Sequence, residues 1–202
     1  MPATMMHLFA GHALWPAGSD AFFLGCILPD CLNGDRAAKD RVHLRDVPKD
    51  ERLTRLVALG QTLDLSSDYD FGVFFHLYLD FLWDNGPQSD HRRAYQGSDW
   101  FRDYRAHLSR AGSRAYARSL WAKPLWDRLI CADASLWQST FSLPEDKIRA
   151  FLEFNYRWHT KERLSESEIF TDRLVDDFTA DAVEKFRRLM REHFPAVTRL
   201  CL

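Results

Sequence analysis

The stretch 71–84 is apolar on almost every side and most constrains what this chain can fold into. If this stretch is helical it is a buried helix, because a surface helix needs a polar face. It nevertheless carries His76 and Asp80, which are four residues apart and therefore lie one turn apart on the same face. An unpaired carboxylate buried there would cost about 3–5 kcal/mol. The stretch thus predicts a buried helix in which Asp80 requires a partner.

Two kinds of partner satisfy this requirement. A metal ion does so, because it binds a deprotonated carboxylate and a neutral imidazole. A hydrogen bond between His76 and Asp80 inside a helical core does so as well, and this helix alone leaves both interpretations open. We favour the first interpretation, in which the helix supplies two ligands and the rest of the chain closes around it.

Helical periodicity and capping signals predict an all-α fold. Further helices or apolar helical segments are predicted over residues 5–15, 21–28, 51–63, 99–108, 115–120, 125–136, 143–158 and 179–193. Residues 31–50 are predicted to form an ordered loop, and Ser66-Ser67-Asp68 to cap the central helix. Capping boxes are predicted at Ser142 and Ser165. No alternating strand pattern or internal repeat is visible, so we expect a single helical domain over residues 1–202, with a metal site built from residues 7–84.

Composition narrows the class of protein further. A chain of 202 residues suits one domain, and its net charge of −2 argues against nucleic-acid binding that relies on bulk charge. Its four cysteines form no C-x-x-C pair, which is typical of reduced thiols in a cytosolic protein. The first twenty residues show no signal peptide, and no apolar run is long enough to span a bilayer. We therefore expect a cytoplasmic protein without a transmembrane segment.

Several polar residues stand in otherwise apolar surroundings. They are His7, Asp30, His43, His76 and Asp80. Three imidazoles and two carboxylates form a mixed nitrogen and oxygen donor set, which Zn²⁺ accepts and which Fe or Mn also tolerates. Asp30 directly follows Pro29 at the end of an apolar segment, a suitable place from which to present a carboxylate to a site.

Four motifs follow one another within the first 84 residues. They are Met-Pro-Ala-Thr followed by His7, Phe23-Leu24-Gly25-x-x-x-Pro29-Asp30, Lys39-x-x-x-His43 and Gly72-x-x-x-His76-x-x-x-Asp80-x-x-Trp83. In order and spacing they resemble the zinc-dependent phospholipase C family, which shares a helical fold with the S1/P1-type nucleases. The resemblance implies that Asp30, His43, His76 and Asp80 bind one zinc ion, and that His7 and Asp80 bind another.

The chain departs from this family in two respects. Secreted members carry a signal peptide and an exposed terminal Trp, and neither is present here. The family's remaining zinc requires a later His followed by a His-x-x-x-Glu or His-x-x-x-Asp pair, whereas His91 lies beyond a Gly-Pro turn and His159 is followed at the fourth position by Arg163. We expect one zinc ion or two, rather than three, in a short, cytosolic-type member.

The expected function is a metal-dependent hydrolase acting on a phosphate ester, phospholipase C-like or phosphodiesterase-like, with a metal-bound water as the nucleophile. The resemblance suggests that Asp30 doubles as the catalytic base that orients this water. The substrate would be a small-molecule or lipid phosphoester. The alternative is a non-catalytic helical protein with a structural metal site or a binding role. A helical phosphohydrolase of the HD type ranks last, because that class requires a His directly followed by an Asp and the chain has no such pair.

The remaining polar candidates have ordinary interpretations. Asp84 continues the His76 and Asp80 face by one turn, where it can support a metal ligand, although a surface carboxylate at the helix end is the simpler expectation. Lys39 and Arg41 can meet a phosphate beside the metal, although a solvated charged loop is the simpler expectation. The histidines expected to lie at the surface or the edge of the core are His12, His91, His107, His159 and His193.

Overall fold

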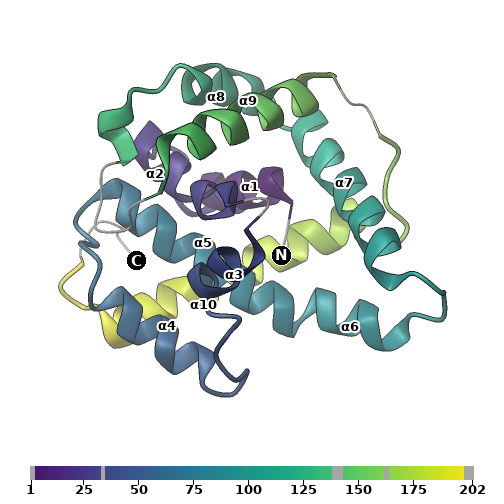
Figure 1. Ribbon diagram of the computed structural model, residues 1–202, viewed down its shortest axis with the longest axis horizontal. Helices are drawn as coiled ribbons and strands as arrows, with labels where there is room; N and C mark the ends of the chain where they lie inside the picture. The colour runs from purple at the N-terminus through teal and green to yellow at the C-terminus, as the bar shows by residue number, and fades with distance from the viewer. Residues whose placement is uncertain (1–2, 33–34, 138–142, 162–163, 198–202) are drawn as a thin grey trace.

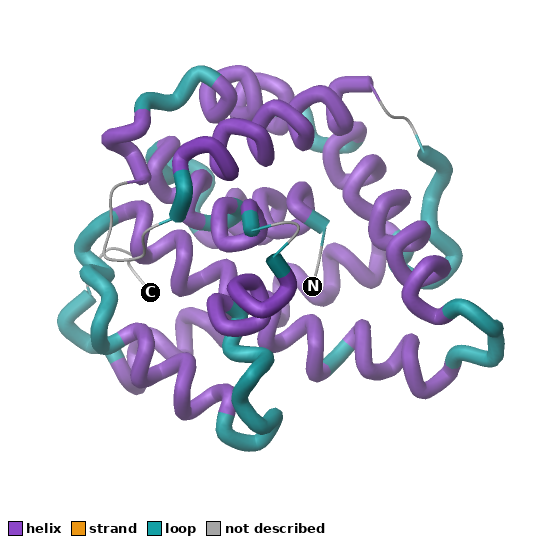
Figure 2. The backbone as a smooth tube through the Cα atoms, viewed as in Figure 1, coloured by secondary structure: helices purple, strands orange, loops and turns teal. Residues whose placement is uncertain are grey.

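Helix α5 (Asp68–Asn85) runs through the interior of the fold and is surrounded by other helices (Figure 1). The computed structural model describes residues 3–32, 35–137, 143–161 and 164–197, and no strand occurs in these ranges (Figure 2). Fourteen of the eighteen residues of α5 are buried, which explains why its sequence lacks a polar face. The Ser67 side chain accepts a hydrogen bond from the backbone of Asp70, so the predicted cap is confirmed, as is the all-α fold.

Helices α1 (Thr4–Leu14) and α2 (Asp20–Gly25) lie against α5 at the centre of the fold (Figure 1). The backbones of α2 and α5 are in direct contact at two glycines. A Cβ atom on Gly25 would lie 2.2 Å from the carbonyl oxygen of Tyr69, and one on Gly72 would lie 2.2 Å from that of Phe22. This close approach brings the chain after α2, including the short 3₁₀ helix η1 (Leu28–Cys31), to the face of α5 that carries His76.

The other helices enclose this centre. They are α3 (Arg36–Val42), α4 (Arg52–Gly60), α6 (Pro87–Ala94), α7 (Trp100–Ala117), α8 (Ala122–Ile130), the 3₁₀ helix η2 (Ala134–Trp137), α9 (Glu145–Lys161) and α10 (Asp172–His193). In Figure 1, α8 and α9 lie along one side of α1 and α2, and α4 and α6 lie along the opposite side. Helix α10 contacts α1, α5 and α7.

Aromatic packing fixes α10 on the central helix. The ring of Phe186 lies 5.6 Å from that of Phe71, 5.8 Å from that of Phe74 and 4.8 Å from that of Phe75, measured between centroids. Tilted and edge-on pairs at such distances contribute about 0.5–1.5 kcal/mol each beyond the area they bury. A large hydrophobic cluster therefore joins residues from Met5 to Phe194, and a smaller one contains Trp83, Tyr104 and Phe170.

The prediction of a loop over residues 31–50 is wrong in part, because α3 lies within it. Asp35 caps this helix by accepting a hydrogen bond from the backbone of Ala38. None of the seven α3 residues is buried, so the segment lacks the apolar periodicity that would have identified a helix.

The two helices predicted over residues 99–108 and 115–120 form one continuous helix, α7. Gly112, which lies between the two predicted helices, is inside α7 at a close contact, where an added Cβ would be 3.0 Å from the Cβ of Ala3. Helix α6 is absent from the helices predicted above, and Pro87 occupies its first turn. Helix α8 begins at Ala122, before the predicted start at residue 125, and Pro124 lies within its first turn.

The predicted capping box at Ser165 is also wrong. The helix expected from residue 179 begins at Asp172, and its cap is Thr171, whose side chain accepts from the backbone of Leu174. Ser142 lies outside the described residues, whereas the helix predicted after it is present as α9. Among the described helices, none is long and apolar enough to cross a membrane.

Candidate metal centre

Helix α5 presents His76 to the segment that follows α2. The Nδ1 atom of His76 lies 2.7 Å from the backbone carbonyl oxygen of Cys26. A carbonyl oxygen only accepts hydrogen bonds, so Nδ1 must carry the proton and donate it. In the neutral ring, Nε2 then holds a lone pair that is directed away from α2.

His43 is fixed in the same way by its own helix. It stands at the C-terminal end of α3, and its Nδ1 atom donates to the backbone carbonyl oxygen of Lys39 over 2.7 Å. Its Nε2 atom lies 3.1 Å from Nε2 of His76. Two neutral rings in these tautomers direct lone pairs at each other, an arrangement that is repulsive without a proton or a metal ion between the nitrogens.

Two carboxylates adjoin this imidazole pair. Asp80 Oδ2 lies 3.4 Å from His43 Nε2 and 4.0 Å from His76 Nε2, and Asp80 Oδ1 lies 3.3 Å from His7 Nε2. Asp30, which belongs to η1, places Oδ1 3.5 Å from His43 Nε2. The His7 ring stacks on that of His76 with a centroid distance of 4.0 Å.

The five residues predicted as metal ligands therefore lie together. Two overlapping groups have donor atoms close enough to hold an ion, namely His7, His76 and Asp80, and Asp30, His43 and His76. All five residues are at most 5% exposed. Among the described residues, no hydrogen-bond partner is found for either ring nitrogen of His7 or for Oδ1 of Asp80. Such buried donor atoms without hydrogen bonds fit a divalent ion that prefers nitrogen and oxygen ligands.

The protonation states suit metal binding. Burial, followed by the neighbouring His7, lowers the pKa of His76 to about 3, so its ring is neutral at pH 7. Burial raises the pKa of Asp80, but the contact with His7 and the nearby His43 outweigh this effect and place the pKa well below its usual range. Burial also raises the pKa of Asp30. The hydrogen bond with His43 and the charge of Lys39 outweigh this effect, so the pKa of Asp30 is well below its usual range. A neutral imidazole and ionised carboxylates are the forms that bind a metal.

Two arginines that were not predicted to belong to the site lie beside its carboxylates. Arg45 lies 3.1 Å from both Asp80 and Asp84, and Arg52 lies 3.2 Å from Asp84. The expectation that Asp84 is a surface carboxylate is wrong, because it is 7% exposed and joined to two arginines. Arg45 belongs to the charged run after α3, where nothing in the sequence distinguishes it from solvated neighbours.

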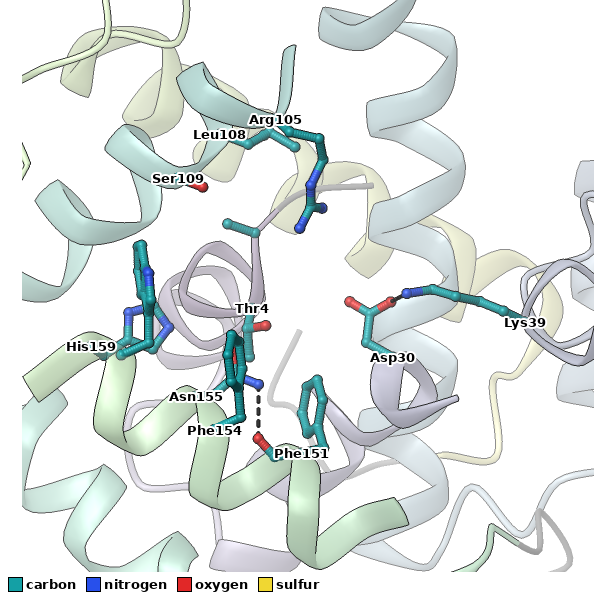
Figure 3. A pocket seen from close by; sticks show the side chains of 12 residues that line it. Thr4, Asp30, Lys39, Arg105, Leu108, Ser109, Phe151, Phe154, Asn155 and His159 are labelled. Atoms are coloured by element: carbon teal, nitrogen blue, oxygen red, sulfur yellow. Dashed lines mark hydrogen bonds and ion pairs between the residues drawn. The ribbon is translucent and has the colours of Figure 1, made fainter. Parts of the chain in front are cut away.

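Lys39 and His159 also differ from their ordinary expectations. The Lys39 ammonium group lies 3.0 Å from Asp30 Oδ1, as the dashed line in Figure 3 marks, so Lys39 is not merely a solvated loop residue. His159 of α9 is 2% exposed and therefore lies inside the fold rather than at its surface.

Comparison of this chain with protein-family models, with curated proteins and with solved structures gives no match. The resemblance to the zinc-dependent phospholipase C family therefore rests on the motifs of residues 1–84, and functional inference rests on the site itself.

Proposed function

We propose that this protein is a metal-dependent hydrolase of a phosphate ester, with zinc as the metal. The observation that carries the proposal is the pair of Nε2 atoms of His43 and His76, which face each other at 3.1 Å while both Nδ1 atoms donate to backbone carbonyls. A divalent ion bound by both nitrogens removes the repulsion between their lone pairs.

Asp30, His43, His76 and Asp80 would hold one ion, and His7 with Asp80 supplies donors for a second. When bound, such an ion lowers the pKa of a coordinated water toward 7 and polarises a phosphoryl oxygen. The backbone carbonyls of Cys26 and Lys39 orient the two imidazoles by accepting a hydrogen bond from Nδ1. A histidine that binds a metal through one ring nitrogen usually donates such a hydrogen bond from the other.

The site adjoins a surface cavity at Asp30. His7 and His76 are completely buried, whereas Asp30 and Lys39 line a surface cavity (Figure 3). A substrate reaching the site through this cavity would meet the Asp30 carboxylate first. Because the pKa of Asp30 is held low, it is ionised at neutral pH and can accept a hydrogen bond from the attacking water.

Hydrolysis of two chromogenic substrates, p-nitrophenyl phosphate and bis-p-nitrophenyl phosphate, tests this function. Zinc-loaded protein should release nitrophenol and chelated protein should not, and Asp30→Asn should lose most of the activity when assayed with saturating zinc. A conserved rate after chelation, or in zinc-loaded Asp30→Asn, would contradict the proposed roles.

A second candidate is a structural site without catalysis, and one observation favours it. All five donor residues are at most 5% exposed, and a closed donor set is typical of a structural metal ion. Zinc that raises the melting temperature but supports no hydrolysis of either nitrophenyl substrate would support this candidate.

A further inference from the structure

A cavity of about 170 Å³ adjoins the candidate metal centre and lies between α1, α7 and α9. Asp30 and Lys39 form one side of it, and Figure 3 shows Arg105 reaching into it from α7 opposite α9. A cavity of roughly 150 Å³ holds a benzene ring in a protein interior. This space therefore suits a single aromatic ring or a short alkyl group, and it is too small to enclose a long acyl chain.

The charges of the cavity lining favour an anion. Asp30 is paired with Lys39, whereas no ion pair joins Arg105 to a carboxylate among the described residues. The lining thus carries one excess positive charge even before a divalent ion is bound nearby. Guanidinium groups bind phosphate through two parallel, charge-assisted hydrogen bonds, so Arg105 is suited to a phosphoryl group.

The opposite wall is aromatic. Phe151, Phe154 and Trp158 lie at helical spacing along α9 and all line the cavity. Phe154 is 62% exposed and lines the cavity, so its ring is open to contact by a bound group. An apolar group resting against it would cover this surface, and rings stack favourably at such positions.

We propose that this cavity is the substrate pocket of the hydrolase and that its substrate is a small phosphoester with one compact apolar or aromatic group. Arg105 binds the phosphoryl oxygens, and Phe154 with Trp158 contacts the organic group. This proposal rests on the proposed function, because the phosphorus must lie beside Asp30 to be attacked.

Binding of two non-hydrolysable probes, phenylphosphonate and methylphosphonate, tests the pocket separately from catalysis. Titration calorimetry on zinc-loaded protein should give a dissociation constant about tenfold lower for phenylphosphonate, the difference expected when one ring becomes buried. Equal affinity for the two probes would overturn the proposed apolar contact.

Variants test the two sides of the pocket separately, Arg105 on α7 and Phe154 on α9. Arg105→Met should weaken both phosphonates about tenfold or more, as expected when a charge-assisted hydrogen bond is lost. Phe154→Ala should weaken phenylphosphonate alone. Both side chains are exposed, so these changes leave the core intact. Arg188→Met, which removes an exposed charge from α10, is the matched control and should alter neither affinity. A loss in Arg188→Met equal to that in Arg105→Met would overturn the assignment of Arg105.

The pocket and the proposed function fail in different ways. If phenylphosphonate binds with the predicted dependence on Arg105 and Phe154 but no nitrophenyl phosphoester is hydrolysed, the pocket is supported and the hydrolase is not. If hydrolysis depends on zinc and Asp30 but is unchanged in Arg105→Met and Phe154→Ala, the substrate binds elsewhere and the pocket proposal is overturned.

Discussion

His43 and His76 approach each other to 3.1 Å through Nε2 atoms, although each ring already donates its Nδ1 proton to a backbone carbonyl. This relationship depends on the backbone as much as on the two side chains. The Cys26 carbonyl reaches His76 only because α2 and α5 touch at Gly25 and Gly72. The candidate metal centre is therefore a product of helix packing.

Removing the central imidazole tests both its structural and its metal-binding roles. His76→Ala should lower the free energy of unfolding by about 2–5 kcal/mol, because it leaves a cavity and an unpaired Cys26 carbonyl. It should also abolish the rise in melting temperature that zinc gives the unsubstituted protein. Thermal unfolding with zinc and with a chelator measures both effects. A variant that keeps the full zinc-dependent rise would contradict the role of His76.

The helix contact can be tested without altering any polar group. Gly72→Ala would place a Cβ 2.2 Å from the Phe22 carbonyl, so α2 and α5 must separate, at a cost of about 3 kcal/mol or more. Gly11→Ala is the matched control, since the nearest atom to its Cβ would be a side-chain atom, the Cys26 sulfur, at 3.1 Å. Denaturant unfolding should show a much smaller loss for Gly11→Ala. Similar losses for both variants would show that the α2–α5 contact is not specially tight.

Arg45 and Arg52, which both contact Asp84, predict a large effect of substitution at a residue that was expected to lie at the surface. Asp84→Asn removes the carboxylate between Arg45 and Arg52 and should cost about 3 kcal/mol, because it leaves buried positive charge unpaired. Asp90→Asn, at the exposed ion pair with Arg93, should cost less than about 1 kcal/mol. Comparable losses in denaturant unfolding would contradict the buried pairing.

The pH dependence of stability should contain a contribution from His159, whose pKa burial lowers to about 3. Between pH 6.5 and 3 the unfolded chain binds a proton at this residue and the folded chain does not, so stability falls as the pH is lowered. From pH 6.5 to 5.0 this loss amounts to about 1.5 kcal/mol. Between pH 6.5 and 5.0, the free energy of unfolding should fall by about 1.5 kcal/mol less in His159→Leu than in the unsubstituted protein, as measured by denaturant unfolding. His193→Leu, a substitution at an exposed position, is the control and should show the same fall as the unsubstituted protein. Parallel pH profiles for His159→Leu and the parent would contradict the neutral buried state.

The parts of the fold that could be predicted from sequence are those with a local signal. The apolar pattern of residues 71–84 and the Ser67 cap identify α5, and the four-residue spacing places His76 and Asp80 on one face. Helix α3 escaped prediction because it buries no residue, and α7 was divided because Gly112 serves a close helix contact rather than a turn.

The site depends on contacts that local patterns do not reveal. That Asp30 and His43 join the α5 pair was expected from motif order, and the structure brings them together. Arg105 lies on a helix with no motif of its own, so only the packing of α7 against α1 and opposite α9 identifies it as part of the cavity. Arg45 could not be predicted either, because charged residues surround it in the sequence and only its contacts with Asp80 and Asp84 distinguish it.

Elemental analysis of untagged protein, equilibrated with zinc and then desalted, tests the central claim most directly. The donor set predicts about one tightly held zinc ion per chain, or two if His7 and Asp80 hold a second, and almost none in His43→Ala or His76→Ala. Desalted protein with no bound zinc, and with the same melting temperature before and after equilibration, would show that these imidazoles and carboxylates form a hydrogen-bonded core and bind no metal.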